Sequence, residues 1–469
     1  MIQYLQDILT LFKRKTLNVS GIEADLYRLL QAKDVSSALN MFQDRTEDVD
    51  NAIKEYNPQT HKVMYRPNKP RKNERPYITE KLPRTRQRYI NEVELFFIFG
   101  SPLRFTKSSG SDKAFKLFTD FVASSHFDSR MRQAKRLAGA ETECAKLYHL
   151  YNDNGKTAVK SVILARSTGY ELRPLFNQFG DLVAFAYGFR TKDGSKKTIQ
   201  HWSFETSETI FDCVQTETGW DVTARANPTK KINVIYYRQP KAWDGVEARL
   251  QREEELDSKI GDTNNYFADP VAKASADVIR SLASPETTGK LIQMNGATSV
   301  FEYVNPPQSS ELRRSEQENL EKSILFDTFT PDFSFENMRG LGSVSGVAIK
   351  NAMILGFLKA DNRKEVYTEL INRDLSLIKA ILAYQHPAEA KELEELEVDF
   401  EYSAPFAEDD QSSKSFILSV YQAGLVTLET AVSLLALTKA PEEEIKALKE
   451  KAEQSKEKEE QPPEENKDF

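Results

Sequence analysis

Two short segments contain residue types and spacings that could do chemistry. Residues 340–346 read GLGSVSG, and three glycines within seven positions suggest a loop that could cradle phosphate groups. This loop lacks the lysine and the serine or threonine that a P-loop needs, and no strand pattern precedes it. The acidic run 253–255 follows Arg252 and could bind metal, but such runs are usually solvated helix faces, which is what we expect here.

The other reactive residue types are scattered along the chain. There are five histidines and two cysteines, Cys144 and Cys213, with no H-x-x-x-H, H-E-x-x-H or C-x-x-C spacing. His126 and His149 fall in helical patterns, where surface or core roles are far commoner than catalysis. The sequence therefore predicts no enzymatic activity, no metal site and no cofactor, and it favours a reducing compartment.

The charge balance restricts the partners of the chain. The 469 residues include 64 Lys and Arg and 71 Asp and Glu, which gives a formal net charge of −7. A protein that grips nucleic acid with its whole surface is normally basic, so that class is disfavoured, whereas a protein past which DNA slides is not. No apolar run reaches the roughly 18 residues of a membrane span, so we expect no membrane contact.

The glycine-bearing loop lies between two predicted helices of opposite character. Residues 307–329 are strongly polar and predict a solvent-exposed helix. Its few apolar residues fall on one narrow stripe: Leu312, Leu320 and Ile324. Pro331 disfavours the helical conformation at Thr330, and the glycines that follow allow backbone angles that most residues avoid. Residues 347–358 are apolar almost all round and predict a buried helix. The loop over 330–346 should therefore project from the two helices that precede and follow it.

The residues on both sides of this loop carry a recognisable pattern. Residues 330–334 read TPDFS, and residues 345–350 read SGVAIK. Together they resemble the segment before and within the tunnel helix of tailed-bacteriophage portal proteins of the SPP1-like family. The resemblance implies an α+β portal fold with a mixed helical and antiparallel-β wing, two stem helices, a small α/β clip and a helical C-terminal crown. The order of the predicted elements extends it to most of the chain.

The first half of the chain fits the wing, which the resemblance implies for residues 1–240. Apolar residues recur at helical spacing through residues 1–150, for example from Ile22 to Leu30. Residues 151–240 instead contain six short runs rich in β-branched and aromatic residues, which predict an antiparallel β meander. The basic, proline-bearing residues 65–76 should be a solvated loop, with contact to a neighbouring subunit or to nucleic acid as the alternative.

Residues 241–269 show helical spacing and match the first stem helix of the family. Gly261 interrupts that spacing and indicates a bend or an early end of the helix. Residues 270–306 fit the clip, with one helix over 271–284 and a hairpin turn at Asn295-Gly296. In portal proteins the clip protrudes from the capsid and meets partner proteins. We expect its partner-binding residues to be Lys290, Gln293, Asn295, Phe301 and Tyr303.

The later segments follow the order of the family. They are the second stem helix (307–329), the tunnel loop (330–346), the tunnel helix with the return to the wing (347–407), the crown (408–455) and a disordered tail (456–469). The return to the wing should contain a long helix over 362–383 and an alternating strand over 396–406. The crown should contain two helices joined at Gly424, the second with Thr427 as its N-cap. The tail is charged and poor in apolar residues, which is typical of disorder.

The resemblance implies a homo-oligomeric ring, commonly a dodecamer, at one vertex of a capsid. Double-stranded DNA would enter through its axis, driven by a large terminase, and leave through it at infection. The clip would dock the terminase and then the head–tail adaptor, and the ring would meet the major capsid and scaffolding proteins. Such a protein is assembled in the host cytoplasm and becomes part of the virion.

A DNA conduit must touch DNA without holding it, because each phosphate–lysine contact adds salt-dependent affinity. We expect contact with DNA from the tunnel loop and its flanks: Asn337, Met338, Arg339, Leu341 and Lys350. The alternative for Arg339 and Lys350 is pairing with acids of the adjacent subunit. In the second stem helix, contacts between subunits or with the channel are expected from Arg313, Arg314, Glu318 and Lys322.

Two other classes of protein remain as alternatives. One is another ring-forming part of the virion, such as a head–tail connector, which normally lacks a clip between two stem helices in so long a chain. The other is a metal-dependent nucleic-acid-processing enzyme, which would need clustered carboxylates on strands. Activity of the purified chain with magnesium or manganese would reveal this second class.

Overall fold

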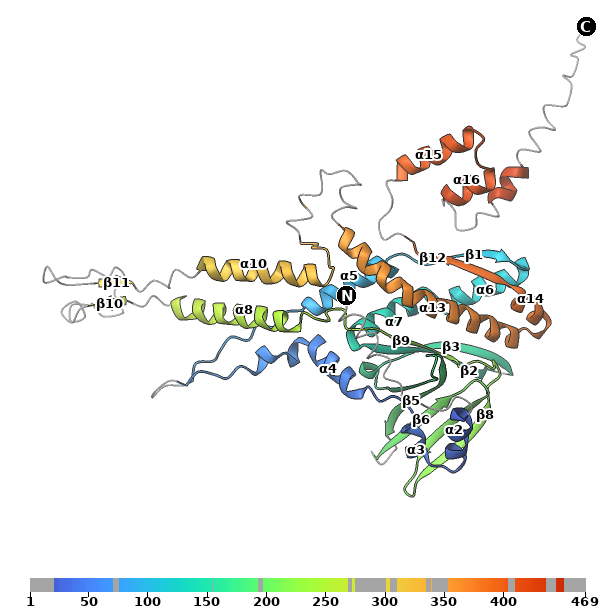
Figure 1. Cartoon of the computed structure of the whole chain (residues 1–469), viewed down its shortest axis with the longest axis horizontal. Coiled ribbons are helices and arrows are strands. Elements are labelled where there is room, and N and C mark those ends of the chain that lie inside the picture. Colours follow the sequence, from blue (N-terminus) through green and yellow to red (C-terminus); the bar gives the residue numbers. More distant parts are fainter. Residues whose placement is uncertain are drawn as a thin grey trace, which may run out of the picture. The chain divides into compact units, whose positions relative to one another are not determined.

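A computed structural model describes most of the chain (Figure 1). The described residues are 21–70, 76–153, 155–192, 197–268, 272–274, 301–303, 310–334, 339, 353–403, 410–435 and 444–450. Two compact units can be distinguished: Met1–Arg339 with Ala352–Ser403, and Gly340–Asn351 with Ala404–Phe469. The architecture mixes helices with antiparallel sheets, as the sequence predicts.

The larger sheet is a five-stranded antiparallel meander whose strands follow the order of the chain. Its strands are β4 (Glu171–Phe176), β5 (Leu182–Lys192), β6 (Thr198–Glu205), β7 (Thr209–Gln215) and β8 (Trp220–Ala226). Four of the six predicted runs form β5 to β8. β4 was not predicted; it contains Pro174, which cannot donate to a ladder, and it accordingly lies at the edge of the sheet.

The smaller sheet has three strands in the order β3-β2-β9. They are β3 (Lys156–Leu164), β2 (Glu143–Asp153) and β9 (Val234–Arg238). β2 corrects the prediction of helix up to residue 150. Its apolar residues Leu147, Leu150 and Tyr151 recur at helical spacing. β2 is nevertheless the central strand, because it pairs with a strand on each side and buries its first six residues.

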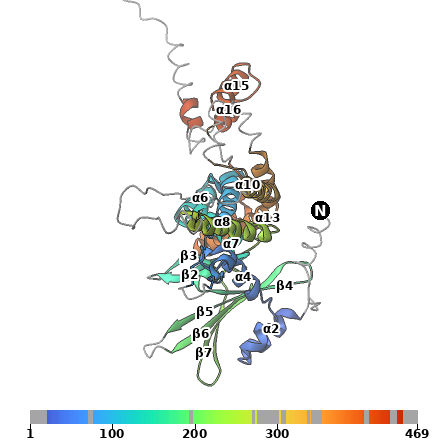
Figure 2. The same cartoon turned by 90° about the vertical axis from the view of Figure 1, so that its left-hand side faces the viewer.

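Two N-terminal helices, α2 (Ile22–Gln31) and α3 (Val35–Leu39), cover one face of the five-stranded sheet. Figure 2 shows α2 beside the strands of this sheet. α2 buries Ile22, Leu26 and Leu30 at four-residue spacing, which confirms the helix predicted there. These side chains share one hydrophobic core with Phe204 and Phe211 of the sheet.

Further helices complete the first unit. They are α4 (Thr46–Tyr56), α5 (Arg86–Phe99), α6 (Asp112–Ser124), α7 (Phe127–Glu141), α8 (Glu247–Ala268), α10 (Ser310–Asp327), α13 (Ile354–Gln385) and α14 (Ala390–Glu395). Short 3-10 turns occur at Pro58–Thr60, Lys62–Tyr65, Arg166–Thr168 and Pro387–Glu389. α5 packs against both α7 and α13, α7 contacts β2, and α13 contacts β9.

α13 differs from the two helices that the sequence predicts over 347–358 and 362–383. It is one helix of 32 residues, since no glycine or proline separates the two patterns. Its first turns are not fully buried either, because Ile354 is 54% exposed and Leu358 is 48% exposed. The first part of the predicted buried helix, residues 347–352, lies outside the described residues.

Two small strand pairs bring together distant parts of the chain. β1 (Arg104–Ser109) pairs with β12 (Glu397–Glu401), which lies within the alternating run predicted to be a strand. β10 (Ala272–Ala274) pairs with β11 (Phe301–Tyr303). β10 is therefore a correction, because a helix was predicted from residue 271. Short-range spacing gave no sign of a partner strand that follows some 27 residues later, and residues 275–300 lie outside the described part.

The second unit contains α15 (Asp410–Gln422) and α16 (Leu428–Leu435). Gly424 lies between them with a φ of 71°, as predicted for the residue that joins the two helices. Thr427 caps α16, because its hydroxyl accepts a hydrogen bond from the backbone N–H of Thr430 at 3.3 Å. Lys449 lies 2.5 Å from Glu429 and ties residues 444–450 to this helix.

A buried ion pair fastens α13 to the three-stranded sheet. Lys146 of β2 and Asp374 of α13 are both fully buried and pair with one another. The Tyr148 hydroxyl also donates to Asp374, at 2.8 Å, and Lys146 lies 4.3 Å from the centre of the Phe127 ring. An ion desolvated to this degree is tolerated only while its partner is present.

Removing one partner should therefore destabilise the first unit strongly. We expect Asp374→Leu to lower the free energy of unfolding by about 3–5 kcal/mol, because Lys146 is left buried without a counter-ion. The double variant Lys146→Met/Asp374→Leu should recover most of that loss. Urea unfolding followed by tryptophan fluorescence measures both, and a loss below about 1 kcal/mol in the single variant would contradict the expectation.

Candidate functional site

α8 and α10 lie side by side and run in opposite directions (Figure 1). Three contacts fix this pairing: Arg249 pairs with Asp327, Arg252 Nη2 lies 2.8 Å from Glu316 Oε1, and the Arg313 guanidinium donates to Thr263 Oγ1 at 3.2 Å. These contacts are ion pairs and hydrogen bonds between side chains. The helices meet here through polar groups, in keeping with their charged sequences.

Apolar contact is concentrated where the helix pair joins the rest of the unit. Trp243 and Val246 before α8, Leu250 in its first turn and Ile324 of α10 form one buried cluster with Ile90 of α5. Leu312, near the other end of α10, is 76% exposed. The end of the helix pair that joins the rest of the unit, which we call its base, is therefore apolar. Of the predicted stripe of apolar residues on α10, only the part at this base is buried.

Residues 57–70 and 76–84, which we call the arm, lie on the side of α8 away from α10, and residues 80–84 run along α8 (Figure 1). Alternate backbone N–H groups of the arm, at Glu80, Leu82 and Arg84, donate to Asp262, Ser258 and Glu254 at 2.7, 2.9 and 2.8 Å. The three acceptors are spaced by four residues, or about 6 Å of helix, and two residues of extended chain span about 6.6 Å. The arm is therefore bound nearly in step with the turns of α8.

Gly261 lies within this contact. The helix continues through it to Ala268, so the early end, one of the two alternatives predicted for Gly261, is wrong. A Cβ at this position would lie 3.1 Å from the Cγ and 3.3 Å from the Cβ of Glu80, and 3.5 Å from Leu82. Glycine costs a helix about 1 kcal/mol relative to alanine. The close approach of the arm gives a physical reason for a glycine here.

Two carboxylates of the acidic run are buried beneath the arm. Glu253 is 1% exposed and Glu254 is 3% exposed, so the prediction of a solvated face is wrong for both. Arg84 and Arg86 lie 3.0 and 3.1 Å from Glu253 Oε1. Burial raises the pKa of Glu253, and the two guanidinium groups act against that shift. Glu255 does fit the prediction, because its side chain is 46% exposed.

His61 joins the beginning of the arm to Glu254. Its Nδ1 lies 2.6 Å from Glu254 Oε1, and its Nε2 lies 2.8 Å from the carbonyl oxygen of Glu55. Both ring nitrogens thus face acceptors, which only the doubly protonated imidazolium satisfies. Burial opposes the charge, but these two acceptors outweigh it and raise the pKa of His61 above its ordinary value.

Comparison with known proteins identifies the family. A family model described as "Phage portal protein, SPP1 Gp6-like" matches residues 37–458. The chain belongs to this family. No match was found among curated proteins.

Two solved structures are similar to the chain over 85% of its length and 95% of theirs. The neck of a native GTA particle computed with C12 symmetry has 8% identity and a TM-score of 0.44. The virion of a native gene transfer agent (GTA) particle has 7% identity and a TM-score of 0.42.

The portal-family residues predicted in the second helix make contacts within the chain. Arg314 Nε lies 3.0 Å from Glu318 Oε1 along α10, and both side chains are more than half exposed. Arg313 reaches Thr263 of α8, and Lys322 is exposed. Contacts of these residues with another subunit or with a channel stay predictions.

The remaining predicted residues are placed only in part. Phe301 and Tyr303 lie in β11, opposite Ala274 and Ala272. Arg339 is exposed. Those that lie outside the described residues are Lys290, Gln293, Asn295, Asn337, Met338, Leu341 and Lys350.

α5 holds the first residues of the predicted tunnel loop and the helix that follows the loop. On one side, the Tyr89 hydroxyl donates to the carbonyl of Pro331 and accepts from the N–H of Phe333, both at 2.8 Å. On the other side, Phe357 of α13 packs edge-on against Phe97, with ring centres 5.1 Å apart. Phe333 also stacks on Phe97. One helix therefore supports the beginning of the loop and the helix beyond its end.

A charged cluster in the core also links α5 to α13. Glu94 is 1% exposed and has three cationic neighbours: Lys135 at 2.7 Å, Arg363 at 3.1 Å and Lys359 at 3.2 Å. Burial would raise the pKa of Glu94, but the three cations lower it well below its usual range. Burial also lowers the pKa of Lys359 to about 8 in spite of Glu94.

Sequence reasoning missed both the arm contact and this cluster. The acceptors of α8 do carry a signal, since Glu254, Ser258 and Asp262 follow one another at intervals of four.

The described part of the chain contains no group of three or more His, Cys, Asp or Glu side chains that could hold a metal ion. No helix in it is long and apolar enough to cross a membrane.

Filling the space above Gly261 should release the arm. We expect Gly261→Val to push Glu80 and Leu82 away from α8 at a cost of about 1–3 kcal/mol, and so to speed trypsin cleavage after Lys81 at least about fivefold. Asn264→Val, at an exposed position of the same helix, is the matched control and should leave cleavage unchanged. Equal cleavage rates in the two variants would show that the arm does not depend on this close approach.

The charge of His61 should make the stability of the arm contact depend on pH. Because its pKa is raised in the folded chain, this stabilisation is complete below the ordinary histidine pKa of about 6.5 and is lost as the pH rises through the folded-state value. We expect His61→Gln to remove that decline, and His386→Gln to retain it. Urea midpoints from about pH 5.5 to about pH 9 test this; parallel profiles for wild type and His61→Gln would contradict it.

Proposed function

We propose that this portal-family chain forms a closed ring at one vertex of a virion capsid and that double-stranded DNA passes through its axis. The observation that carries the proposal is the family match over residues 37–458. A ring made from one kind of chain needs two different, complementary surfaces on each copy. The proposed ring has about a dozen copies, as is common in the family.

In this proposal the described elements take the roles that the family suggests. Residues 1–240 are the wing, α8 and α10 are the two stem helices, and β10 and β11 form the part of the clip next to the stem. Residues 330–346 are the tunnel loop, and residues 408–455, which include α15 and α16, are the crown. The antiparallel pairing of α8 with α10 supports this reading, because the segment between them must begin and end at the same end of the pair.

The charges of the stem helices suit a conduit past which DNA slides. α8 has six acidic and three basic residues, and α10 has five acidic and three basic residues. The exposed Arg314 is paired with Glu318, which lowers its attraction for phosphate. Since each free cation that binds a phosphate adds salt-dependent affinity, a stem of this kind would not retain DNA.

The tunnel loop is the proposed place of closest contact with DNA. Its first residues and the helix that follows it are held on α5, so a force on the loop would be borne by the core of the first unit. Arg339 is exposed there and is the proposed phosphate contact, with Lys350 nearby in the sequence. The other proposed contacts are Asn337, Met338 and Leu341.

The proposed partners follow the two ends of a ring at a capsid vertex. The clip would dock the large terminase during packaging and the head–tail adaptor afterwards, through residues such as Phe301 and Tyr303. The major capsid and scaffolding proteins would surround the ring. Another ring-forming head–tail connector is the alternative, and the helix pair that flanks β10 and β11 favours the portal.

Mass and symmetry of the purified chain test the ring directly. Native mass spectrometry with negative-stain class averages should show a closed ring of about a dozen copies with an axial hole. A chain that stays monomeric or dimeric at high concentration, and also when its capsid proteins are present, would rule the proposal out.

Deleting residues 335–342 should separate assembly from DNA handling. The ring should form normally, because Pro331, Phe333 and Phe357 stay anchored on α5, while the yield of packaged genomes should fall at least tenfold. A Gly-Ser linker of equal length is the control: it restores the length without the side chains and should also fail. Normal packaging in either variant would exclude the loop as the DNA contact.

A further inference from the structure

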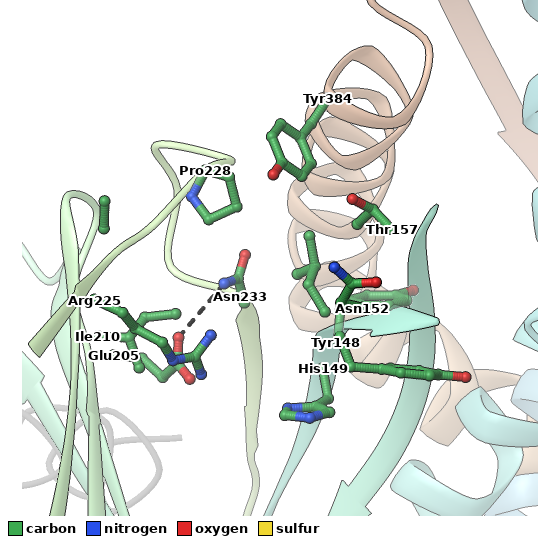
Figure 3. Close-up of a pocket in the computed structure, with 13 residues that line it drawn as sticks. Tyr148, His149, Asn152, Thr157, Glu205, Ile210, Arg225, Pro228, Asn233 and Tyr384 are labelled. Atoms are coloured by element: carbon green, nitrogen blue, oxygen red, sulfur yellow. Dashed lines mark hydrogen bonds between the residues drawn. The ribbon is translucent and has the colours of Figure 1, made fainter. Parts of the chain in front are cut away.

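A pocket of about 380 Å³ lies between the two sheets and the C-terminal end of α13 (Figure 3). Glu205 of β6, Arg225 of β8 and Asn233 line one side, His149 of β2 lines the other, and Tyr384 of α13 lies at one end. None of the roles proposed above uses this pocket.

Glu205 is buried in the wall of the pocket with few partners. It is 2% exposed, and one hydrogen bond reaches it among the described residues, from Asn233 Nδ2 to Oε2 at a long 3.5 Å. The same Asn233 amide makes a shorter bond to Asn227, at 3.1 Å. A buried carboxylate normally accepts several hydrogen bonds, so Glu205 lacks the partners that would stabilise its charge.

The nearby charges do not balance that of Glu205. Arg225 is the adjacent cation, and its Nε donates at 3.3 Å to Asp212 of β7, which also accepts from Ser203 at 2.8 Å. Two carboxylates thus share one guanidinium group. Burial and the charge of Arg225 lower the pKa of His149, so this ring adds no positive charge at neutral pH. With Glu205 ionised, the group has one negative charge in excess.

The shape of the pocket suits an organic cation better than a metal ion. The described residues place no three metal-ligating side chains together here, and Glu205 is the one carboxylate in the lining. Ile210, which is 2% exposed, and Pro228 give the pocket apolar walls. The Tyr384 hydroxyl and the Asn152 side chain offer further oxygen acceptors (Figure 3).

We propose that this pocket binds a primary ammonium group, with the Glu205 carboxylate as its counter-ion and the aliphatic stem of the ligand against Ile210 and Pro228. The ammonium supplies the missing positive charge and three N–H donors to a carboxylate that has one weak partner. Two sources fit this chemistry: a free alkylamine, and the lysine side chain of a second copy of the chain. An alkylamine and a lysine side chain both carry their ammonium group at the end of a flexible alkyl chain.

The direct test is a titration of the full-length chain with n-butylammonium chloride, with n-butanol as the uncharged ligand of equal stem length. We expect butylammonium to bind with a dissociation constant on the order of 1 mM and butanol not to bind. Glu205→Gln should weaken butylammonium binding at least tenfold. Glu208→Gln, which changes an exposed glutamate of the neighbouring turn, should leave it unchanged. Equal binding by wild type and Glu205→Gln, or none by wild type, would overturn the proposal.

A second measurement tests the proposal without any variant. Burial raises the pKa of Glu205 to about 7 although Arg225 opposes this. The other titratable groups that act on Glu205 or line the same pocket are Asp212, Tyr187, His149, Tyr148, Tyr151 and Tyr384. Binding by wild type should therefore weaken as the pH falls through about 7, because the counter-ion takes up a proton. Binding that is independent of pH across this interval would exclude Glu205 as the counter-ion.

The two sources of the ammonium group are distinguished by repeating the titration at low and at high protein concentration. A free amine should bind with equal affinity in the monomer and in any assembly. A lysine of a second copy would fill the pocket on assembly, so butylammonium would bind the monomer alone, and Glu205→Gln would weaken self-association. Either result supports the proposal.

Discussion

The arrangement of the helix pair depends on a row of acceptors along α8 that need donors once they are covered. Asp262, Ser258 and Glu254 face the arm, and its alternate backbone N–H groups satisfy them. Burying a carboxylate without such partners is strongly unfavourable. α8 can therefore bury Glu254 and Asp262 on this face only because the arm supplies the donors. The glycine at 261 and the doubly hydrogen-bonded His61 follow from the same requirement, since one admits the arm and the other neutralises Glu254.

The polar helix pair and the core of the first unit meet at α5. Ile90 packs in the apolar cluster at the base of α8 and α10, and Tyr89 binds the chain after α10. Phe97 stacks on Phe333 at the beginning of the predicted tunnel loop and contacts Phe357 beyond its end edge-on. On the same helix, Glu94 gathers three cations from α7 and α13. The members of such a buried charge cluster cannot move independently, because displacing one of them leaves another charge buried without a partner. α5 is thus suited to keep the beginning of the predicted loop and the helix after it fixed relative to the base of the helix pair.

The sequence predicted those elements whose periodicity matches their burial. α2 buries one residue in four, and β5 to β8 follow β-rich runs separated by turn signals. It failed where a distant partner decides. The spacing of Leu147, Leu150 and Tyr151 reads as helix, but two flanking strands make β2. β10 is a strand because β11 lies beside it, and Glu253 and Glu254 are buried because an arm some 170 residues earlier crosses them. No local pattern contains that information.

The buried carboxylates also change what the net charge says about a DNA conduit. A charge of −7 favours a chain that does not grip DNA, but the argument depends on where the acids lie. Glu253, Glu254 and Asp262 are buried and paired with histidine, arginine and backbone N–H groups of the same chain, so a DNA phosphate would not sense them as free charges. A repulsive lining can come only from acids that stay exposed. On α10 these include Glu311 and Glu318, and Glu318 is already balanced by Arg314. Weak retention of DNA in the proposed channel therefore follows from neutralised arginines more than from an excess of negative charge.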